Sequence, residues 1–153
     1  LDAGLERECA ACWVPKDELL AGSDHLVLVL PYGPETHHAI GAAELARMKP
    51  SAVLVNIARG GVVDDAALAD ALAHGRLAAA GLDVYENEPA VNPALLACRN
   101  VVLTPHIASA STATRRAMVA LAVDNLIAAL GEGPDAGRPP NPIHADSSLA
   151  RRP

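Results

Sequence analysis

The chain has 153 residues, which is the size of one domain, and 51% of them are hydrophobic, enough for a packed core. With one Trp, two Tyr and no Phe, that core must be built from Ala, Leu, Val and Ile. A net charge of −6 gives no indication of a nucleic-acid partner, whose phosphate backbone would favour a basic protein. No uncharged apolar run approaches the ~18 residues of a membrane span. The chain does not begin with Met or with a secretion signal, so we expect a fragment of a longer protein.

The elements of the first third are a mixture of short helices and strands. Residues 3–9 are interpreted as the end of a helix, residues 10–14 as a short strand, and residues 15–22 as a short helix with Pro at its start. The run "DHLVLVLP", residues 24–31, is continuously apolar, which is typical of a strand covered on both faces.

The middle of the chain alternates more regularly. Residues 41–50 predict a helix that stops before Pro50, and residues 51–58, "SAVLVNIA", predict the next strand. Residues 64–75 predict a helix capped by Asp64 and ended by Gly75.

The last part continues this alternation. We predict a third strand, a short helix, a fourth strand and the longest helix, at residues 77–84, 92–98, 100–105 and 111–131. The tail from Glu132 is rich in proline and is expected to be extended or disordered. The predicted organisation is a truncated dinucleotide-binding domain (1–110), a long crossover helix (111–131) and a tail (132–153).

Strands alternating with helices indicate an α/β fold, a partial doubly wound parallel sheet of about four strands. Ligands of such sheets bind beyond the carboxyl ends of the strands. Three of these ends carry ionisable residues: Arg59 in "VNIARGG", Asp83 and Glu88 in "GLDVYENEP", and His106 in "LTPHIAS". Each has a plain structural explanation alone, but parallel strands bring the three loops to one edge.

The combination of Arg59, Glu88 and His106 suits a 2-oxo acid. A guanidinium binds a carboxylate with two parallel hydrogen bonds. A carboxylate beside an imidazole orients the ring and makes it a good proton donor. Arg59 would therefore bind the substrate carboxylate, and His106 would protonate the keto oxygen as hydride arrives.

These segments, in this order, closely resemble the D-isomer-specific 2-hydroxyacid dehydrogenases. Within that family, they are most similar to the glyoxylate/hydroxypyruvate reductases. The resemblance runs from about Asp17 to Leu130. It implies that Arg59 binds substrate, that Glu88 pairs with the catalytic His106, and that Asp83 meets the nicotinamide carboxamide. It further implies a cofactor, NAD or NADP, lined by Leu30, Pro31, Ile57, Ala58, Arg59, Asp83, His106 and Ala108, with no metal.

The resemblance leaves other positions without a role. Glu86 has none, and His37 and His38 are interpreted as a solvated pair. Tyr32 and Tyr85 are expected to pack rather than to touch ligand. The "CAAC" stretch from Cys9 to Cys12 is interpreted as coincidence, and the odd cysteine count favours a reducing cytoplasm.

The chain also departs from the family. It has no G-x-G-x-x-G, and the family's substrate domain is missing, so we expect weak NAD(P) binding and little turnover by these residues alone. The parent would be a homodimer that makes a D-2-hydroxy acid. Two alternatives stay open: a dinucleotide-sensing corepressor-like protein of the same fold, and a truncated product inactive alone. A formate dehydrogenase is disfavoured, because that family has Gln where Glu88 stands.

Overall fold

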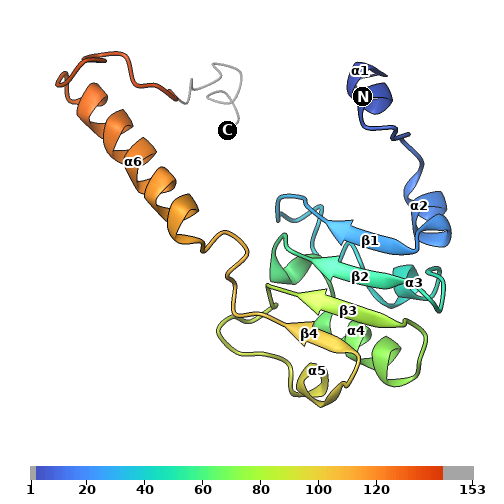
Figure 1. Cartoon of the computed structure of the whole chain (residues 1–153). Coiled ribbons are helices and arrows are strands. Elements are labelled where there is room, and N and C mark those ends of the chain that lie inside the picture. The colour runs from blue at the N-terminus through green and yellow to red at the C-terminus, as the bar shows by residue number, and fades with distance from the viewer. Residues whose placement is uncertain (1–2, 143–153) are drawn as a thin grey trace, which may run out of the picture. The chain divides into compact units, whose positions relative to one another are not determined.

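The computed structural model describes residues 3–142, in two compact units, Leu1–Ile107 and Ala108–Pro153. The domain boundary expected at residue 110 stays a prediction, and the first unit contains the sheet. The elements of the first unit, coloured blue to gold in Figure 1, are α1 (Ala3–Glu8), α2 (Lys16–Gly22), β1 (His25–Leu28), α3 (Ala42–Leu45), β2 (Val53–Asn56), the 3₁₀ turn η1 (Gly60–Val62), α4 (Asp65–Ala73), β3 (Ala79–Leu82), α5 (Pro93–Ala97) and β4 (Val101–Leu103).

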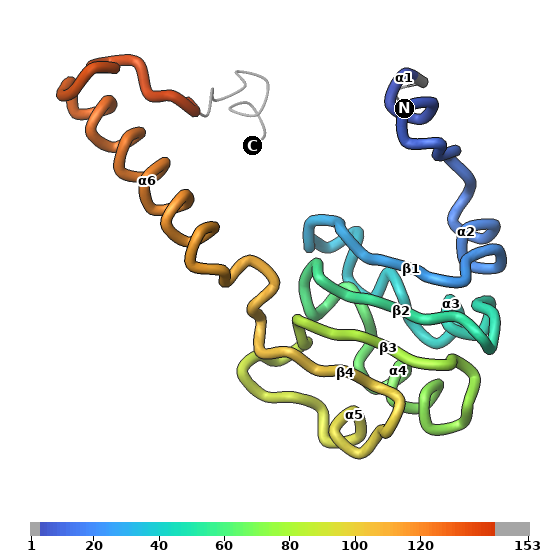
Figure 2. The backbone as a smooth tube through the Cα atoms, viewed as in Figure 1, coloured from blue at the N-terminus to red at the C-terminus, as the bar shows by residue number. Residues whose placement is uncertain are grey.

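The four strands form one parallel sheet in the order β1-β2-β3-β4, which confirms the predicted α/β class. In register, Leu26 lies beside Leu54, Leu54 beside Ala80, and Ala80 beside Val101. Because all strands run the same way, their carboxyl ends share one edge, and the backbone tube in Figure 2 shows the loops after β2, β3 and β4 leaving from that edge. The parallel direction of the strands therefore places these three loops, which carry the candidate site residues, at one edge of the sheet.

The helices α2, α3, α4 and α5 contact one another in sequence and cover one face of the sheet. The strand side chains on this face, among them Leu26, Leu54 and Leu82, are buried in a single core with Leu68 and Leu72 of α4. This core is aliphatic, as the composition predicted.

The other face of the sheet is not covered by these helices. Val27 of β1 is 51% exposed and Val29 just beyond it is 75% exposed, so the expectation that residues 24–31 are covered on both faces is wrong for the described chain. The physical reason is the strand order. Right-handed crossovers that step in one direction along a sheet put all their helices on the same side.

Local signals account for most element ends. Asp64 caps α4, its side chain accepting a hydrogen bond from the N–H of Ala67 at 2.9 Å, and Gly75 follows the helix with φ +66°. The predicted strand at residues 10–14 is wrong. Trp13 there is 62% exposed, and its N–H donates to Glu6 instead of to a neighbouring strand.

The second unit is built on α6 (Thr112–Ala129), which is capped by Ser111 as its side chain accepts from the N–H of Thr114. After α6 the described part of the tail turns back. The N–H of Gly137 donates to the carbonyl of Ala128 at 2.7 Å, and Asn141 bonds Asn125. Residues 132–142 are thus less extended than expected, and the prediction for residues 143–153 lies outside the described residues.

No helix within residues 3–142 is both long enough and apolar enough to cross a bilayer.

Candidate functional site

Three of the predicted site residues line one hollow at the carboxyl edge of the sheet. Arg59 comes from the loop after β2, Glu88 from the loop after β3, and His106 from the segment after β4. The hollow has a volume of about 450 Å³. Its remaining walls are Tyr32, His37, Gly60, Gly61, Tyr85, Glu86 and Asn87. Because the strands are parallel, a guanidinium, a carboxylate and an imidazole from positions between residues 59 and 106 lie in the same hollow.

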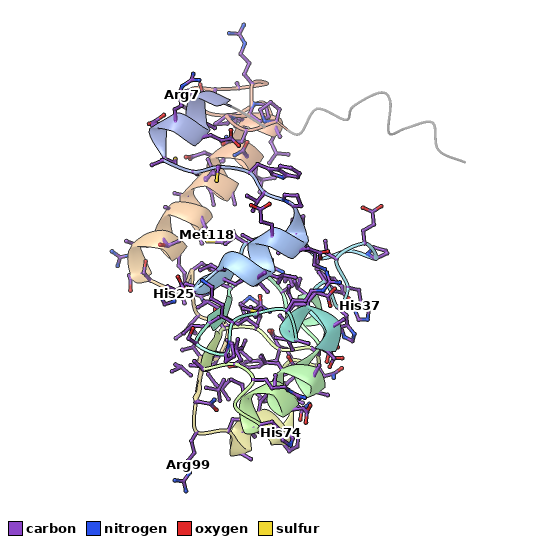
Figure 3. The ribbon with its side chains drawn as sticks, turned by 90° about the vertical axis from the view of Figure 1, so that its right-hand side faces the viewer. Arg7, His25, His37, His74, Arg99 and Met118 are labelled. Carbon is purple, nitrogen blue, oxygen red and sulfur yellow. The ribbon has the colours of Figure 1, made fainter. Side chains whose placement is uncertain are left out.

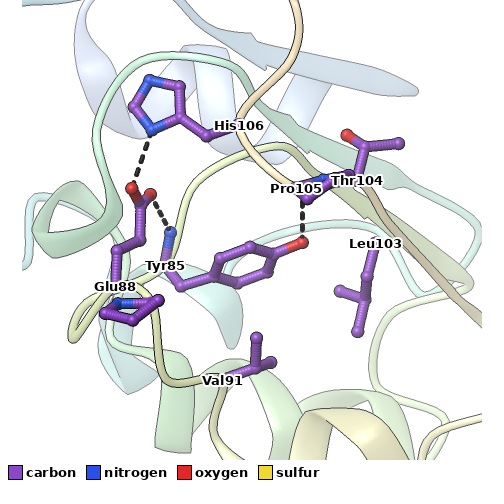
Figure 4. A pocket seen from close by; sticks show the side chains of 8 residues that line it. Tyr85, Glu88, Val91, Leu103, Thr104, Pro105 and His106 are labelled. Atoms are coloured by element: carbon purple, nitrogen blue, oxygen red, sulfur yellow. Dashed lines mark hydrogen bonds and ion pairs between the residues drawn. The ribbon is translucent and has the colours of Figure 1, made fainter.

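Glu88 and His106 are directly bonded. Oε2 of Glu88 lies 2.7 Å from Nδ1 of His106, and Oε1 accepts from the N–H of Tyr85 at 3.0 Å (Figure 4). Burial raises the pKa of Glu88, but the hydrogen bonds from His106 and from Tyr85 outweigh it and hold that pKa below its ordinary value. Glu88 is therefore an ionised acceptor that fixes the ring of His106. The other ring nitrogen, Nε2, points away from Glu88 in Figure 4.

His106 sits on a strained but anchored backbone. Its φ is +54°, a left-handed conformation that non-glycine residues rarely adopt. Asp83, at the end of β3, accepts hydrogen bonds from the hydroxyl of Thr104 at 2.5 Å and from the N–H of Ile107 at 2.8 Å. Tyr85 donates its hydroxyl proton to the carbonyl of Thr104 at 2.7 Å. The segment that carries His106 is thus held on both sides of the histidine.

Asp83 therefore has a structural task that the sequence did not reveal. Its carboxylate is buried, and it links β3 to the histidine-bearing segment of β4. Tyr85 is buried as well, in agreement with the expectation that it packs. Tyr32, in contrast, is half exposed, and its hydroxyl lies 3.1 Å from Nδ1 of His37 at the rim of the hollow, so the packing expectation for Tyr32 is wrong.

The loop that carries Arg59 is shaped by a buried asparagine. Asn56, 1% exposed, accepts from the N–H of Ala58 at 3.0 Å and donates to the carbonyl of Arg59 at 3.1 Å. The guanidinium of Arg59 donates through Nη1 to the carbonyl of Ala58 at 2.6 Å. A polar residue inside the apolar run "SAVLVNIA" was the available signal for this role, and the sequence interpretation missed it.

Gly60 brings the arginine loop against the glutamate loop. A Cβ built on Gly60 would lie 1.8 Å from the carbonyl oxygen of Tyr85 and 2.5 Å from the nitrogen of Glu86. Only a glycine allows this backbone contact. The approach of the two loops, and with it the spacing of Arg59 and Glu88, depends on it.

A second hollow of about 680 Å³ adjoins Arg59 beyond the ends of β1 and β2. Its walls are Val29, Leu30, Pro31, Tyr32, Ile57, Ala58 and Arg59. Five residues predicted to line a dinucleotide, Arg59 among them, thus line one hollow. Arg59 borders both hollows. Ala108 opens the second unit, and its predicted contact stays a prediction.

His38 is not part of a solvated pair, and that interpretation is wrong. Its Nε2 lies 2.5 Å from Oε1 of Glu86, and its ring stacks on His37 with centroids 3.9 Å apart. Glu86, which had no assigned role, also accepts from the N–H of Asp65 at 3.3 Å. The doubled histidine gave no sequence signal for this contact, because its partner lies 48 positions away.

No group of histidine, cysteine or acidic side chains suited to a metal ion occurs within residues 3–142, and Cys9, Cys12 and Cys98 are free thiols.

Comparison with known proteins identifies a family. Residues 4–108 match the family described as D-isomer specific 2-hydroxyacid dehydrogenase, NAD binding domain. The chain is 58% identical over 115 residues to glyoxylate/hydroxypyruvate reductase B of Pectobacterium atrosepticum, covering 74% of this chain and 36% of the relative. It is 52% identical over 123 residues to glyoxylate reductase of Thermococcus gammatolerans, covering 80% of this chain and 37% of that relative. The chain thus spans little more than a third of these relatives.

Solved structures give the same result. The crystal structure of a glyoxylate reductase from Paecilomyes thermophila matches with a TM-score of 0.79 at 45% identity, covering 85% of this chain and 39% of that one. An NADPH-dependent glyoxylate/hydroxypyruvate reductase from Sinorhizobium meliloti, in complex with NADP and malonate, matches with a TM-score of 0.73 at 42% identity, covering 84% and 42%.

Proposed function

The chain belongs to the D-isomer-specific 2-hydroxyacid dehydrogenases, and we propose that it is the carboxyl-terminal portion of an enzyme that reduces a small 2-oxo acid to a D-2-hydroxy acid. Glyoxylate and hydroxypyruvate are the proposed substrates, and NADH or NADPH is the proposed hydride donor. The observation that carries the proposal is the 2.7 Å contact between Glu88 and His106 in a hollow shared with Arg59.

Arg59 is proposed to bind and orient the substrate. Its guanidinium has five N–H donors in a planar fork, and the bond to the carbonyl of Ala58 uses only Nη1. The remaining donors can form the paired hydrogen bonds that a carboxylate accepts. The second hollow, beyond the ends of β1 and β2, is proposed to hold the nicotinamide ring. Since Arg59 borders both hollows, a carboxylate bound there would lie between that ring and His106.

His106 is proposed to be the proton donor. With Nδ1 bonded to Glu88, the proton for the keto oxygen is carried on Nε2, and in the reverse direction the same atom accepts it. Glu88 keeps the ring in place through its contact with Nδ1. A bound NADH or NADPH would supply the hydride. The residues proposed to hold that cofactor are Leu30, Pro31, Ile57, Ala58 and Asp83.

The test is turnover. Oxidation of NADH and of NADPH is measured with glyoxylate and with hydroxypyruvate, using this chain and a longer protein that contains it together with an upstream substrate domain. We expect activity from the longer protein and little from the chain alone. In the longer protein, Arg59→Gln should lower kcat/KM by roughly 10- to 100-fold, the effect of losing hydrogen bonds between charged groups.

Arg76→Gln is the matched control, because Arg76 pairs with Asp70 and lines neither hollow of the site. A longer protein that binds NADH but reduces neither acid would contradict the proposal and favour the dinucleotide-sensing alternative. Equal losses from the two arginine substitutions would contradict the role of Arg59.

A further inference from the structure

Outside the proposed catalytic pair, a second histidine–carboxylate pair connects three segments of the first unit. His38 Nε2 lies 2.5 Å from Oε1 of Glu86. Oε2 of Glu86 accepts from the N–H of Asp65 at 3.3 Å, and the N–H of Glu86 donates to Oδ2 of Asp65 at 3.2 Å. Glu86 is therefore bound by three hydrogen bonds, to the loop before α3 and to the first turn of α4.

His38 is itself fixed by its backbone. Its φ is +48°, and its N–H donates to the carbonyl of Gly61 at 2.8 Å. Two residues on, the N–H of Ile40 donates to the carbonyl of Val62 at 3.1 Å. Non-glycine residues rarely adopt this left-handed conformation. These bonds hold His38 to the η1 turn that directly follows Arg59.

Glu86 and Glu88 are two positions apart in the same loop. Glu86 faces His38 and Asp65, whereas Glu88 faces His106 and accepts from the N–H of Tyr85. Because so short a stretch of backbone joins them, a shift of Glu86 moves Glu88 as well. The position of Glu88 relative to His106 thus depends on what holds Glu86.

We propose that His38 is a positioning residue, which by binding Glu86 fixes the loop Tyr85–Glu88 so that Glu88 stays hydrogen-bonded to His106. The proposal rests on the proposed function in one respect only, that Glu88 and His106 are the catalytic pair. His38 itself does not line the hollow that Arg59, Glu88 and His106 share.

The charges around His38 make this contact pH-dependent. Glu86 faces it directly, Asp64 lies 4.0 Å from its Nδ1, Asp65 adjoins Glu86, and His37 stacks on it. The hydrogen bond to Glu86 raises the pKa of His38 above its ordinary value of 6.5, against the opposing effect of burial. A raised pKa means that the stabilisation is complete below the unfolded-state pKa and is lost as the pH rises through the folded-state pKa.

The experiment follows the carboxyl carbon of Glu88 by NMR as a function of pH in this chain. His38→Leu removes the donor to Glu86, whereas His38→Gln keeps an N–H donor near the position of Nε2. We expect the Glu88 titration midpoint to rise by about half a pH unit or more in His38→Leu, because the bond from His106 weakens, and to stay near the native value in His38→Gln.

His74→Leu is the matched control. His74 also pairs with an aspartate, Asp70, but it lies at the end of α4, well apart from His37 in Figure 3. It should leave Glu88 unchanged. An unchanged Glu88 midpoint in folded His38→Leu, or an equal rise in His38→Gln, would overturn the proposal.

A measurement on the native chain covers the case in which His38→Leu does not fold. Amide hydrogen exchange of Tyr85 and Glu86, corrected for intrinsic base catalysis, should accelerate as the pH rises through the His38 titration, because the bond to Glu86 loses its charge. Exchange that ignores the His38 titration would also overturn the proposal. Neither measurement depends on turnover. Failure of the proposed enzymatic activity is therefore distinguishable from failure of the positioning role of His38, because the Glu88 midpoint is expected to rise in His38→Leu in either case.

Discussion

Glu88 and His106 form a bonded pair across two loops, with 2.7 Å between Oε2 of the glutamate and Nδ1 of the histidine. Each member is held by its own support. The N–H of Tyr85 bonds the other oxygen of Glu88, and Asp83 bonds the backbone next to His106. The pair is therefore preorganised by the fold, as proton transfer at a fixed position requires.

Loss of either member of the pair should slow the reaction of the longer protein. We expect His106→Gln to lower kcat by roughly 10²- to 10⁴-fold, the usual contribution of a positioned general acid, and Glu88→Gln to lower it less, because the imidazole itself remains. Steady-state kinetics with glyoxylate measure both. His74→Gln, remote from the hollow, should keep native rates, and a His106→Gln enzyme with native kcat would exclude the proton-donor role.

The stability of the chain should depend on acid pH through Glu88. The folded-state pKa of Glu88 lies below its ordinary value of 4.5. A depressed carboxyl pKa contributes stability above the unfolded-state pKa, and this contribution is lost as the pH falls through the folded-state value. The free energy of unfolding of the native chain minus that of Glu88→Gln, measured in urea, should therefore decrease below about pH 4.5. A difference that grows on acidification would contradict the pairing.

Gly60→Ala should disturb the junction of the two loops. The added methyl group would meet backbone atoms of Tyr85 at 1.8–2.0 Å, which no rotamer change can relieve. We expect a loss of about 2–3 kcal/mol in the free energy of unfolding, measured by denaturant titration. Gly22→Ala is the control, since its Cβ would meet nothing within 4 Å. Equal effects of the two substitutions would show that the contact is unimportant.

Asp83→Ala should destabilise the segment that carries His106. It removes the acceptor for the hydroxyl of Thr104 and for the N–H of Ile107, and a buried donor without a partner costs about 1–3 kcal/mol. Asp83→Asn keeps an acceptor oxygen and should lose less. Amide exchange of Ile107 reports the change directly, and native protection of that amide in Asp83→Ala would contradict the anchoring role.

Particular residues show how far the sequence alone could reach. The apolar runs at residues 51–58 and 77–84 predicted strands β2 and β3, and Asp64 predicted the start of α4, because periodicity and capping are local properties of the chain. The strand at residues 10–14 was wrong, since a short apolar run becomes a strand only if a neighbour pairs with it.

The sequence by itself determined the α/β class, the aliphatic core and the three loop ends that carry Arg59, Glu88 and His106, because spacing and residue type suffice for these. Only the tertiary structure decided that His38 binds Glu86, that Asp83 anchors the segment of His106, and that one face of the sheet stays uncovered. These contacts join residues 24–48 positions apart, and their existence depends on how loops meet at the sheet edge.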